Sequence, residues 1–218
     1  LPNSWLDEVG IRQNLNALAR KNGAHLLEYG NPFGYLPLRE QLSVQLAELG
    51  IPTQASQIVT TQGTSQALDL IVRYLLKPGD AALVEDPGYY NLFGALRLHG
   101  VKMLAVPRAA DGPDVDVLDK LAAQHRPKVY FTQSVMQNPT GTDMSAHVAF
   151  RVLQAAERHD FLVVEDDIFS DLQATPTPRL ATLDRLNRVL YARSFSKTLR
   201  SEEHTSELQS RETISYAV

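Results

Sequence analysis

Tyr191-Ala-Arg-Ser194-Phe-Ser196-Lys197-Thr198 is the stretch around which the rest of the sequence is organised. Residues 189–191 predict a buried strand, because a short run of β-branched, aliphatic and aromatic residues is typical of the core of a parallel sheet. Lys197 then lies just past the end of that strand. Ligands of open α/β sheets collect outside the carboxyl ends of the strands, so this lysine is placed to meet an anion or a carbonyl group. An isolated S-x-S-K more often marks an ordinary surface lysine, and the argument for a site depends on residues upstream.

The composition is that of an ordinary globular protein. The chain has 218 residues, of which 44% are hydrophobic and 21% charged, enough for one large domain or two small ones. The formal net charge is −4 and no run of Lys or Arg exceeds two residues, which argues against a nucleic-acid or acidic-membrane surface. The absence of cysteine excludes disulfides and thiolate metal sites and fits a cytoplasmic protein. The first residues show no signal-peptide pattern, and a start at Leu1 suggests a piece of a longer chain.

Residues 1–35 predict an N-terminal arm and loop. Trp5 to Ala19 carries a loose helical stripe of apolar residues after a capping candidate, Ser4. Residues 28–35 then combine two glycines, a proline and the aromatic residues Tyr29 and Tyr35, which is typical of an irregular loop.

Residues 36–199 alternate helical and extended patterns. Helices are expected at 38–49, 64–76, 89–98, 115–123 and 145–158, and strands at 58–61, 81–84, 101–106, 128–132, 161–164 and 189–191. Parallel neighbouring strands need helical crossovers. The alternation therefore predicts an α/β fold with a mainly parallel sheet flanked by helices.

Two polar segments follow the first two predicted strands. Gln62-Gly63-Thr64-Ser65-Gln66-Ala67 opens a helix, so its backbone N–H groups and two hydroxyls form a ready cradle for a phosphate. A plain helix cap explains this segment equally well. Asp86-Pro-Gly88-Tyr89 places an aromatic ring where it could lie over a flat ligand, although a packed tyrosine is the more common fate of such a residue.

Two further segments follow the last predicted strands before Tyr191. Asn138-Pro139-Thr140-Gly141 has the composition of a turn, and turn geometry alone explains an Asn at its first position in most proteins. Glu165-Asp166-Asp167 ends an apolar strand, where burying the Asp167 carboxylate is unfavourable without a cationic or N–H partner. Three consecutive acids also raise the possibility of a divalent metal. No metal is expected, because neither a calcium-loop spacing nor a pair of histidines at ligand spacing is present.

Together, the order G-T-S-Q-A, D-P-G-Y, N-P-T-G, E-D-D and S-x-S-K resembles the fold-type I, class I/II aminotransferases, which use pyridoxal 5'-phosphate. Each segment alone is weak evidence, but five in family order over residues 29–199 are specific. Residues 106–108, 111–114, 180–184 and 188–191 look most like the aminotransferase domains of MocR-type (GntR-like) transcription regulators. The resemblance implies a three-layer large domain at 36–199, left incomplete because the C-terminal small domain is absent.

The resemblance also implies roles for individual residues. Lys197 would hold the cofactor aldehyde covalently and, once released by the substrate amine, would move the α-proton. Thr64, Ser65 and Ser194 would contact the cofactor phosphate, and Tyr89 would stack on the ring. Asn138 would contact the ring oxygen, and Asp167 the ring nitrogen, with Asp166 as second candidate. Tyr29 would reach the phosphate of the neighbouring subunit in a homodimer.

Two functions share this chemistry. The first is an aminotransferase that exchanges an amino group between an amino acid and a 2-oxo acid. The alternative is the effector-sensing domain of a MocR-type regulator, with little turnover. DNA is expected as a partner only through a winged-helix domain preceding Leu1, and no membrane partner is expected.

Three departures from the family pattern are visible, one of which is the missing C-terminal small domain. Relatives carry a tyrosine shortly after the ring-nitrogen aspartate, where this chain has Ile168-Phe169-Ser170. A second phosphate-binding arginine would fall at His204. Residues 200–218 match a translated sequencing adapter, with residues 211–213 in the place of its variable index. We therefore expect the native sequence to end near Leu199, the tail to be non-native and disordered, and this chain of 218 residues to be inactive.

Overall fold

The computed structural model of the protein describes residues 7–21, 29–173, 177–197 and 214–217, with the backbone alone described at 170 and 214–217. The helices are α1 (Glu8–Lys21), α2 (Leu36–Glu48), α3 (Gly63–Leu75), α4 (Tyr90–Leu98), α5 (Val115–His125), α6 (Ala146–His159) and α7 (Leu180–Asp184), with the short 3-10 turns η3 (Ala55–Gln57) and η4 (Ser170–Leu172). The strands are β1 (Val59–Gln62), β2 (Ala81–Asp86), β3 (Lys102–Ala109), β4 (Gly112–Pro113), β5 (Val129–Thr132), β6 (Leu162–Asp166), β7 (Val189–Ser194) and β8 (Ile214–Ala217).

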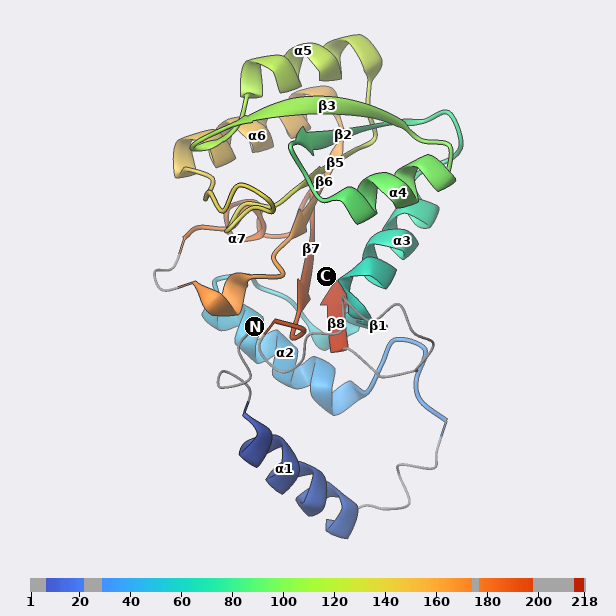
Figure 1. Cartoon of the computed structure of the whole chain (residues 1–218), viewed down its shortest axis with the longest axis vertical. Helices are drawn as coiled ribbons and strands as arrows, with labels where there is room; N and C mark the ends of the chain where they lie inside the picture. The colour runs from blue at the N-terminus through green and yellow to red at the C-terminus, as the bar shows by residue number, and fades with distance from the viewer. Residues whose placement is uncertain (1–6, 22–28, 174–176, 198–213, 218) are drawn as a thin grey trace.

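The strands form a single sheet in the order β1-β8-β7-β6-β5-β2-β3-β4. Strands β3, β2, β5, β6 and β7 are parallel to one another, whereas β4 and β8 pair antiparallel with their neighbours. Figure 1 shows this sheet through the middle of the molecule, with helices on its sides. The predicted α/β class with a mainly parallel sheet is confirmed.

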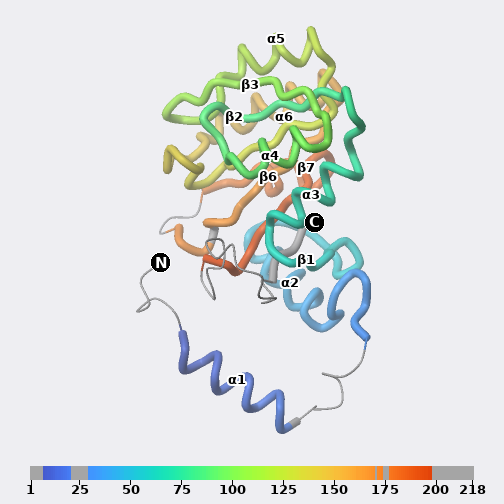
Figure 2. The backbone as a smooth tube through the Cα atoms, turned by 45° about the vertical axis from the view of Figure 1, so that its right-hand side comes forward, coloured from blue at the N-terminus to red at the C-terminus, as the bar shows by residue number. Residues whose placement is uncertain are grey.

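Both faces of the sheet are buried. Along β2, Leu83 packs into one core cluster and its neighbour Val84 into the other, because successive side chains of a strand point to opposite faces. The first cluster is completed by α2, α5, α6 and α7, and the second by α3 and α4. Figure 2 shows the same arrangement after a 45° turn about the vertical axis. Burial on both faces explains why these strands are continuous apolar runs.

Local sequence fixes where several helices begin. The Asp114 side chain accepts hydrogen bonds from the N–H groups of Asp116 and Val117, 3.0 and 3.1 Å away, and so caps α5. Ser145 caps α6 in the same way, accepting from Val148 N–H at 3.2 Å. Such caps satisfy N–H groups that have no partner within the helix. The first turn of α3 has no side-chain cap of this kind.

Strand β8 differs from the sequence prediction. Residues 214–217 were expected to have no place in the fold, yet they pair antiparallel with β1 on one side and with β7 on the other. The physical reason is that β1 and β7 run in the same direction with a gap of one strand between them. A four-residue extended segment therefore finds backbone partners on both edges. Residues 200–213 lie outside the described part of the chain.

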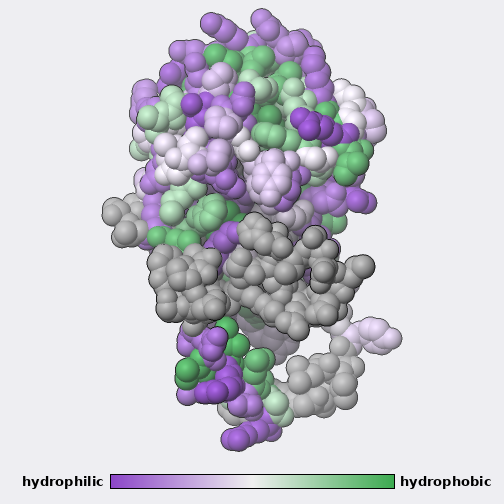
Figure 3. Space-filling view, in the orientation of Figure 1, coloured by the Kyte–Doolittle hydropathy of each residue, from purple (hydrophilic) through white to green (hydrophobic). Residues whose placement is uncertain are grey.

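Helix α1 lies apart from the other elements in Figures 1 and 2. It exposes Val9, Leu15 and Leu18, and Figure 3 shows hydrophobic patches among hydrophilic ones at this end of the molecule. Within the described residues, no helix is long and apolar enough to cross a membrane.

Candidate active site

The predicted site segments all lie at the carboxyl-terminal end of the sheet. Strands β2, β5, β6 and β7 are parallel, and β1 points the same way because β8 is antiparallel to both β1 and β7. The residues after each carboxyl end therefore gather on the same side. These segments are the α3 N-terminus after β1, Tyr89 after β2, the loop of Asn138 after β5, Asp166 and Asp167 at β6, and Lys197 after β7.

A pocket opens at this end between the sheet and helices α3 and α4. Its apolar wall includes Leu68, Phe131 and Val164, and its polar groups include Tyr89, Gln133 and Asp166. Phe131, Gln133, Val164 and Asp166 lie at alternate positions on or just after β5 and β6, so their side chains share one face of the sheet. An apolar wall with a few convergent polar groups is the usual form of a small-molecule site.

Of the two adjacent aspartates, only Asp166 lines this pocket. Its Oδ2 accepts a hydrogen bond from Gln133 Nε2 at 3.0 Å. Asp167 points to the opposite face, is fully buried, and accepts from Arg179 Nε at 2.8 Å and from the Tyr191 hydroxyl at 2.5 Å. Burial raises the pKa of Asp167, and the Arg179 guanidinium counteracts that rise. The sequence placed Asp167 at the site, whereas the structure places Asp166 at the pocket and Asp167 against Arg179 and Tyr191 on the opposite face of the sheet.

The start of α3 has the features of an anion site. Gly63 adopts a left-handed φ of 80°, and Thr64 and Ser65 follow in the first turn. The Thr64 hydroxyl is buried and has no hydrogen-bond partner among the described residues, whereas Ser65 is exposed. The uncapped N–H groups of a helix N-terminus and an unused buried hydroxyl together fit a bound phosphate.

Tyr89 follows β2, and Asn138 lies in the loop that follows β5. Tyr89 lines the pocket, its hydroxyl accepts from Asn91 Nδ2 at 2.9 Å, and its ring meets that of Tyr90 edge-on, with 5.7 Å between ring centroids. Asn138 is half-buried in the loop after β5, and its backbone N–H donates to Gln133 Oε1 at 2.8 Å. The structure thus joins Asn138 to the pocket through Gln133.

Lys197 and Ser194 lie where β7 ends. Strand β7 extends through Ser194, three residues beyond the predicted strand, and the buried Ser194 Oγ accepts from Ser196 N–H at 3.1 Å. Lys197 is half-buried, and its Nζ lies 5.7 Å from the centroid of the Phe169 ring. Phe169 comes from the segment after β6, so the two strand ends meet at this contact.

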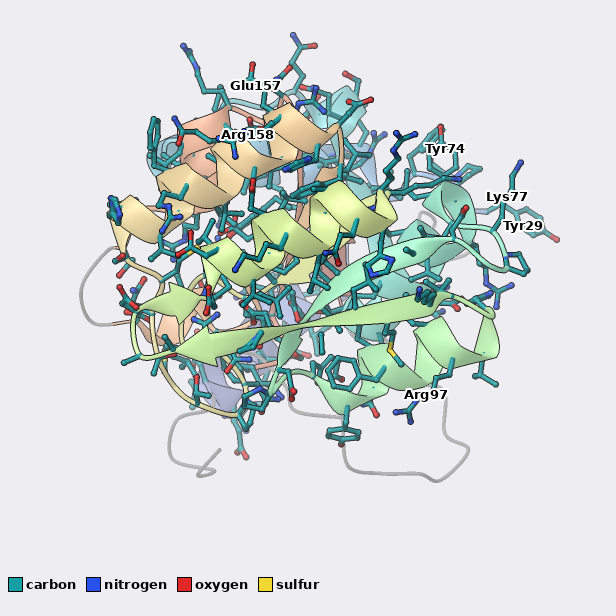
Figure 4. All side chains as sticks on the ribbon, turned by 90° about the horizontal axis from the view of Figure 1, so that it is seen from above. Tyr29, Tyr74, Lys77, Arg97, Glu157 and Arg158 are labelled. Carbon is teal, nitrogen blue, oxygen red and sulfur yellow. The ribbon has the colours of Figure 1, made fainter. Side chains whose placement is uncertain are left out.

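Tyr29 does not join the other predicted residues within one chain. Its side chain is fully exposed, and Figure 4 shows it pointing outward at the rim of the molecule. The loop that carries it is fixed to β1, since Phe33 O accepts from Thr60 N–H at 3.1 Å. Gly34, at φ 96°, lies so close to the Thr60 side chain that a Cβ at this position would collide with it.

Sequence reasoning missed a buried polar cluster beside the pocket. Glu85, at the end of β2, forms a buried ion pair with Arg108 of β3 and accepts from Thr132 Oγ1 at 2.7 Å. Burial raises the pKa of Glu85, and Arg108 counteracts that rise. Arg108 also donates to the carbonyls of Gln133 and Thr142, each 3.2 Å away, and so fixes the loop after β5. Two features of the sequence could have indicated this cluster. They are an arginine, Arg108, after the apolar strand 101–106, and a glutamate, Glu85, directly before Asp86.

Known proteins with a similar sequence fall into two groups. The chain is 33% identical over 187 residues to aromatic-amino-acid aminotransferase 1 of Thermococcus litoralis, covering 82% of this chain and 45% of that protein. It is 32% identical over 184 residues to the probable rhizopine catabolism regulatory protein MocR of Rhizobium meliloti, covering 83% of this chain and 36% of that protein. The chain therefore spans less than half the length of these relatives.

A solved structure shows the same fold. Pyrococcus horikoshii kynurenine aminotransferase, crystallised in complex with PMP, superposes with a TM-score of 0.87 at 31% identity, over 98% of this chain and 52% of that one. The resemblance in strand-end segments is thus matched by sequence and by structure. The model of the family described as aminotransferase class I and II matches residues 8–201, and the chain belongs to that family.

Proposed function

We propose that the protein binds pyridoxal 5'-phosphate and transfers an amino group between an amino acid and a 2-oxo acid. The observation that carries this proposal is the gathering of a pocket carboxylate, a lysine and an open helix N-terminus at one end of the sheet. These are Asp166 on β6, Lys197 after β7 and Thr64 in the first turn of α3. The names of the relatives, which include aminotransferases, support it.

The proposed phosphate contacts are hydrogen-bond donors at the start of α3. Thr64 offers a buried hydroxyl with no described partner, and the first turn of α3 offers backbone N–H groups without a side-chain cap. A phosphate supplies acceptor oxygens to both, and its negative charge is favoured at a helix N-terminus. Ser65 and Ser194 complete the proposed phosphate contacts.

The ring contacts follow from the pocket. When bound, pyridoxal phosphate supplies a ring that accepts the electrons released as a bond at the amino-acid α-carbon breaks. Asp166, rather than Asp167, would hold the proton on the ring nitrogen, because its carboxylate lines the pocket. Tyr89 offers an aromatic face at the same pocket, and Asn138 is the proposed donor to the ring oxygen.

Lys197 is the proposed covalent anchor and proton carrier. Its amine would hold the cofactor aldehyde and, when free, would move the proton at the substrate α-carbon. The Phe169 ring beside Nζ excludes water from one side of the amine, while offering no hydroxyl of its own. An aromatic ring without a hydroxyl therefore stands in place of the family tyrosine in this region.

We further propose that the whole protein is a homodimer. Apolar side chains are exposed on α1, at Val9, Leu15 and Leu18, and on α3, at Leu70 and Tyr74. Exposed apolar side chains gathered on two helices are typical of a protein interface. The outward position of Tyr29 fits a residue that serves the site of a neighbouring subunit.

An amino-transfer assay on the whole protein tests the function. The protein is loaded with pyridoxal phosphate and mixed with a panel of amino acids and 2-oxo acids, and new amino acids are measured by mass spectrometry. The expected result is product formation over many turnovers. Similarity to MocR favours the second candidate, an effector-sensing domain. In that case, amino acids would change the cofactor's absorbance and the DNA affinity of the whole protein, with no sustained product formation.

A further inference from the structure

Gln133 occupies a position between two proposed cofactor contacts. It follows the last residue of β5, is buried, and lines the pocket. Its side-chain Nε2 donates to Asp166 Oδ2 at 3.0 Å, and its Oε1 accepts from the Asn138 backbone N–H at 2.8 Å. One amide group therefore connects the carboxylate proposed for the ring nitrogen with the residue proposed for the ring oxygen.

The direction of this amide is determined by its neighbours. A backbone N–H can only donate, so the amide oxygen must face Asn138. The amide NH2 group then faces Asp166, and a group that can only donate is best matched by an ionised carboxylate, which can only accept. The arrangement favours the charged form of Asp166 and leaves no freedom for the amide to flip.

The backbone of Gln133 is itself anchored. Its N–H donates to Glu85 Oε2 at 3.4 Å, and its carbonyl accepts from Arg108 Nη1 at 3.2 Å. Glu85 and Arg108 form a buried ion pair. The side chain of Gln133 is therefore presented to Asp166 from a fixed backbone, and buried, hydrogen-bonded partners of this kind orient functional carboxylates.

We propose that Gln133 is a positioning residue, which holds the Asp166 carboxylate charged and directed toward the cofactor ring nitrogen while fixing Asn138. The inference rests on the proposed function, because it assigns Asp166 to that nitrogen. Gln133 touches the carboxylate and acts through it. Its loss should therefore change the protonation of the ring nitrogen even where the protein still folds and binds cofactor.

The test uses Gln133→Leu in the whole protein, loaded with cofactor labelled with 15N at the ring nitrogen. The 15N chemical shift reports protonation of that atom directly and does not depend on turnover. In the parent we expect the protonated shift at neutral pH; in Gln133→Leu we expect the shift to move toward the unprotonated value and cofactor affinity to fall about tenfold or more. Gln133→Met, which keeps the length of the side chain but has no group that donates to Asp166 or accepts from Asn138, should change the shift in the same direction.

Gln137→Leu is the matched control. Gln137 is buried in the same loop, but its Nε2 donates to Pro87 O at 2.8 Å and not to Asp166. This variant should leave the 15N shift unchanged. A protonated shift in both Gln133 variants, equal to that of Gln137→Leu, would overturn the inference while leaving the proposed function intact. Failure of the parent to bind the cofactor would overturn the proposed function and this inference together.

Discussion

At the scale of single residues, the two carboxylates at the end of β6 are divided between the two faces of the sheet. Asp166 shares its face with Val164, which belongs to the core cluster under α3 and α4. Asp167 shares its face with Val163, in the opposite cluster. Because the side chains alternate, Asp166 lines the pocket, whereas Asp167 forms a buried ion pair with Arg179.

Asparagine substitutions at the two positions should therefore have different effects. We expect Asp166→Asn to bind cofactor but to exchange the substrate α-proton about tenfold more slowly or worse, because an amide carries no charge to hold the ring-nitrogen proton. We expect Asp167→Asn to lower the free energy of unfolding by about 3 to 5 kcal/mol, because it leaves Arg179 buried without its counter-charge. Exchange is measured by NMR in deuterated water and stability by urea titration. The reverse pattern would return the ring-nitrogen role to Asp167.

Glu165 predicts a pH dependence of stability. Its buried carboxylate accepts from the N–H groups of Leu180 and Ala181, 2.9 and 2.8 Å away. Burial, and then the charge of Asp167, raise the pKa of Glu165 to about 7. The unfolded pKa is about 4.3, so the folded state binds the extra proton between these values and loses stability as the pH rises through them.

We expect the free energy of unfolding to fall by about 4 kcal/mol across that window from this group alone. Glu165→Gln carries no titrating group and should show a correspondingly flatter profile in urea titrations from about pH 4.5 to about pH 8. An unchanged slope in the variant would mean that Glu165 does not titrate in this range.

The sequence did not distinguish which of the adjacent residues Asp166 and Asp167 lines the pocket. The sequence predicted that an aspartate at the end of the strand 161–164 faces the site, but a strand buried on both sides is apolar at every position. Its pattern therefore does not reveal which face carries the pocket. The contacts of Gln133 were equally hidden, because they depend on how the loop after β5 folds back onto β6.

At the scale of elements, the first turn of α3 is the clearest ligand-binding feature. Thr64→Val removes a buried hydroxyl that has no described partner, and it keeps the shape of the side chain. We expect cofactor affinity to fall about tenfold or more, because hydrogen bonds to charged groups contribute about 1.5 to 3 kcal/mol. The cofactor-free protein should be equally or more stable, since burial of an unpaired polar group is unfavourable.

Pyridoxal without a phosphate is the control ligand for Thr64→Val. It should bind the parent and the variant equally, because it lacks the group that the hydroxyl would contact. Weaker binding of pyridoxal and pyridoxal phosphate by the same factor would show that Thr64 acts on the fold of the site and not on the phosphate.

Most helices and strands followed from the sequence, but some short ones did not. Helix α6 and strand β6 lie within two residues of their predicted ends, because the period of apolar residues and the Ser145 cap mark them clearly. Helix α7 was not predicted: its five residues are held by Glu165, a partner distant in sequence. The same is true of β8, whose position depends on a gap between β1 and β7.

At the scale of the whole molecule, the exposed apolar residues on α1 and α3 predict a second copy of the chain. Light scattering on the whole protein should give the mass of a dimer. Leu15→Asp with Leu18→Asp should shift the mass toward a monomer, because each substitution places a charge in the proposed interface. A parent that stays monomeric at micromolar concentration would contradict the dimer proposal and would leave Tyr29 without a partner site.

We propose that the strand ends together hold one cofactor, with Lys197 as its covalent anchor. The most direct measurement is borohydride reduction of the whole protein after loading with pyridoxal phosphate, followed by proteolysis and mass spectrometry of the peptides. We expect a phosphopyridoxyl group on Lys197 and no such label in the Lys197→Ala variant. A label on Lys77, Lys102 or Lys128 in place of Lys197 would contradict it.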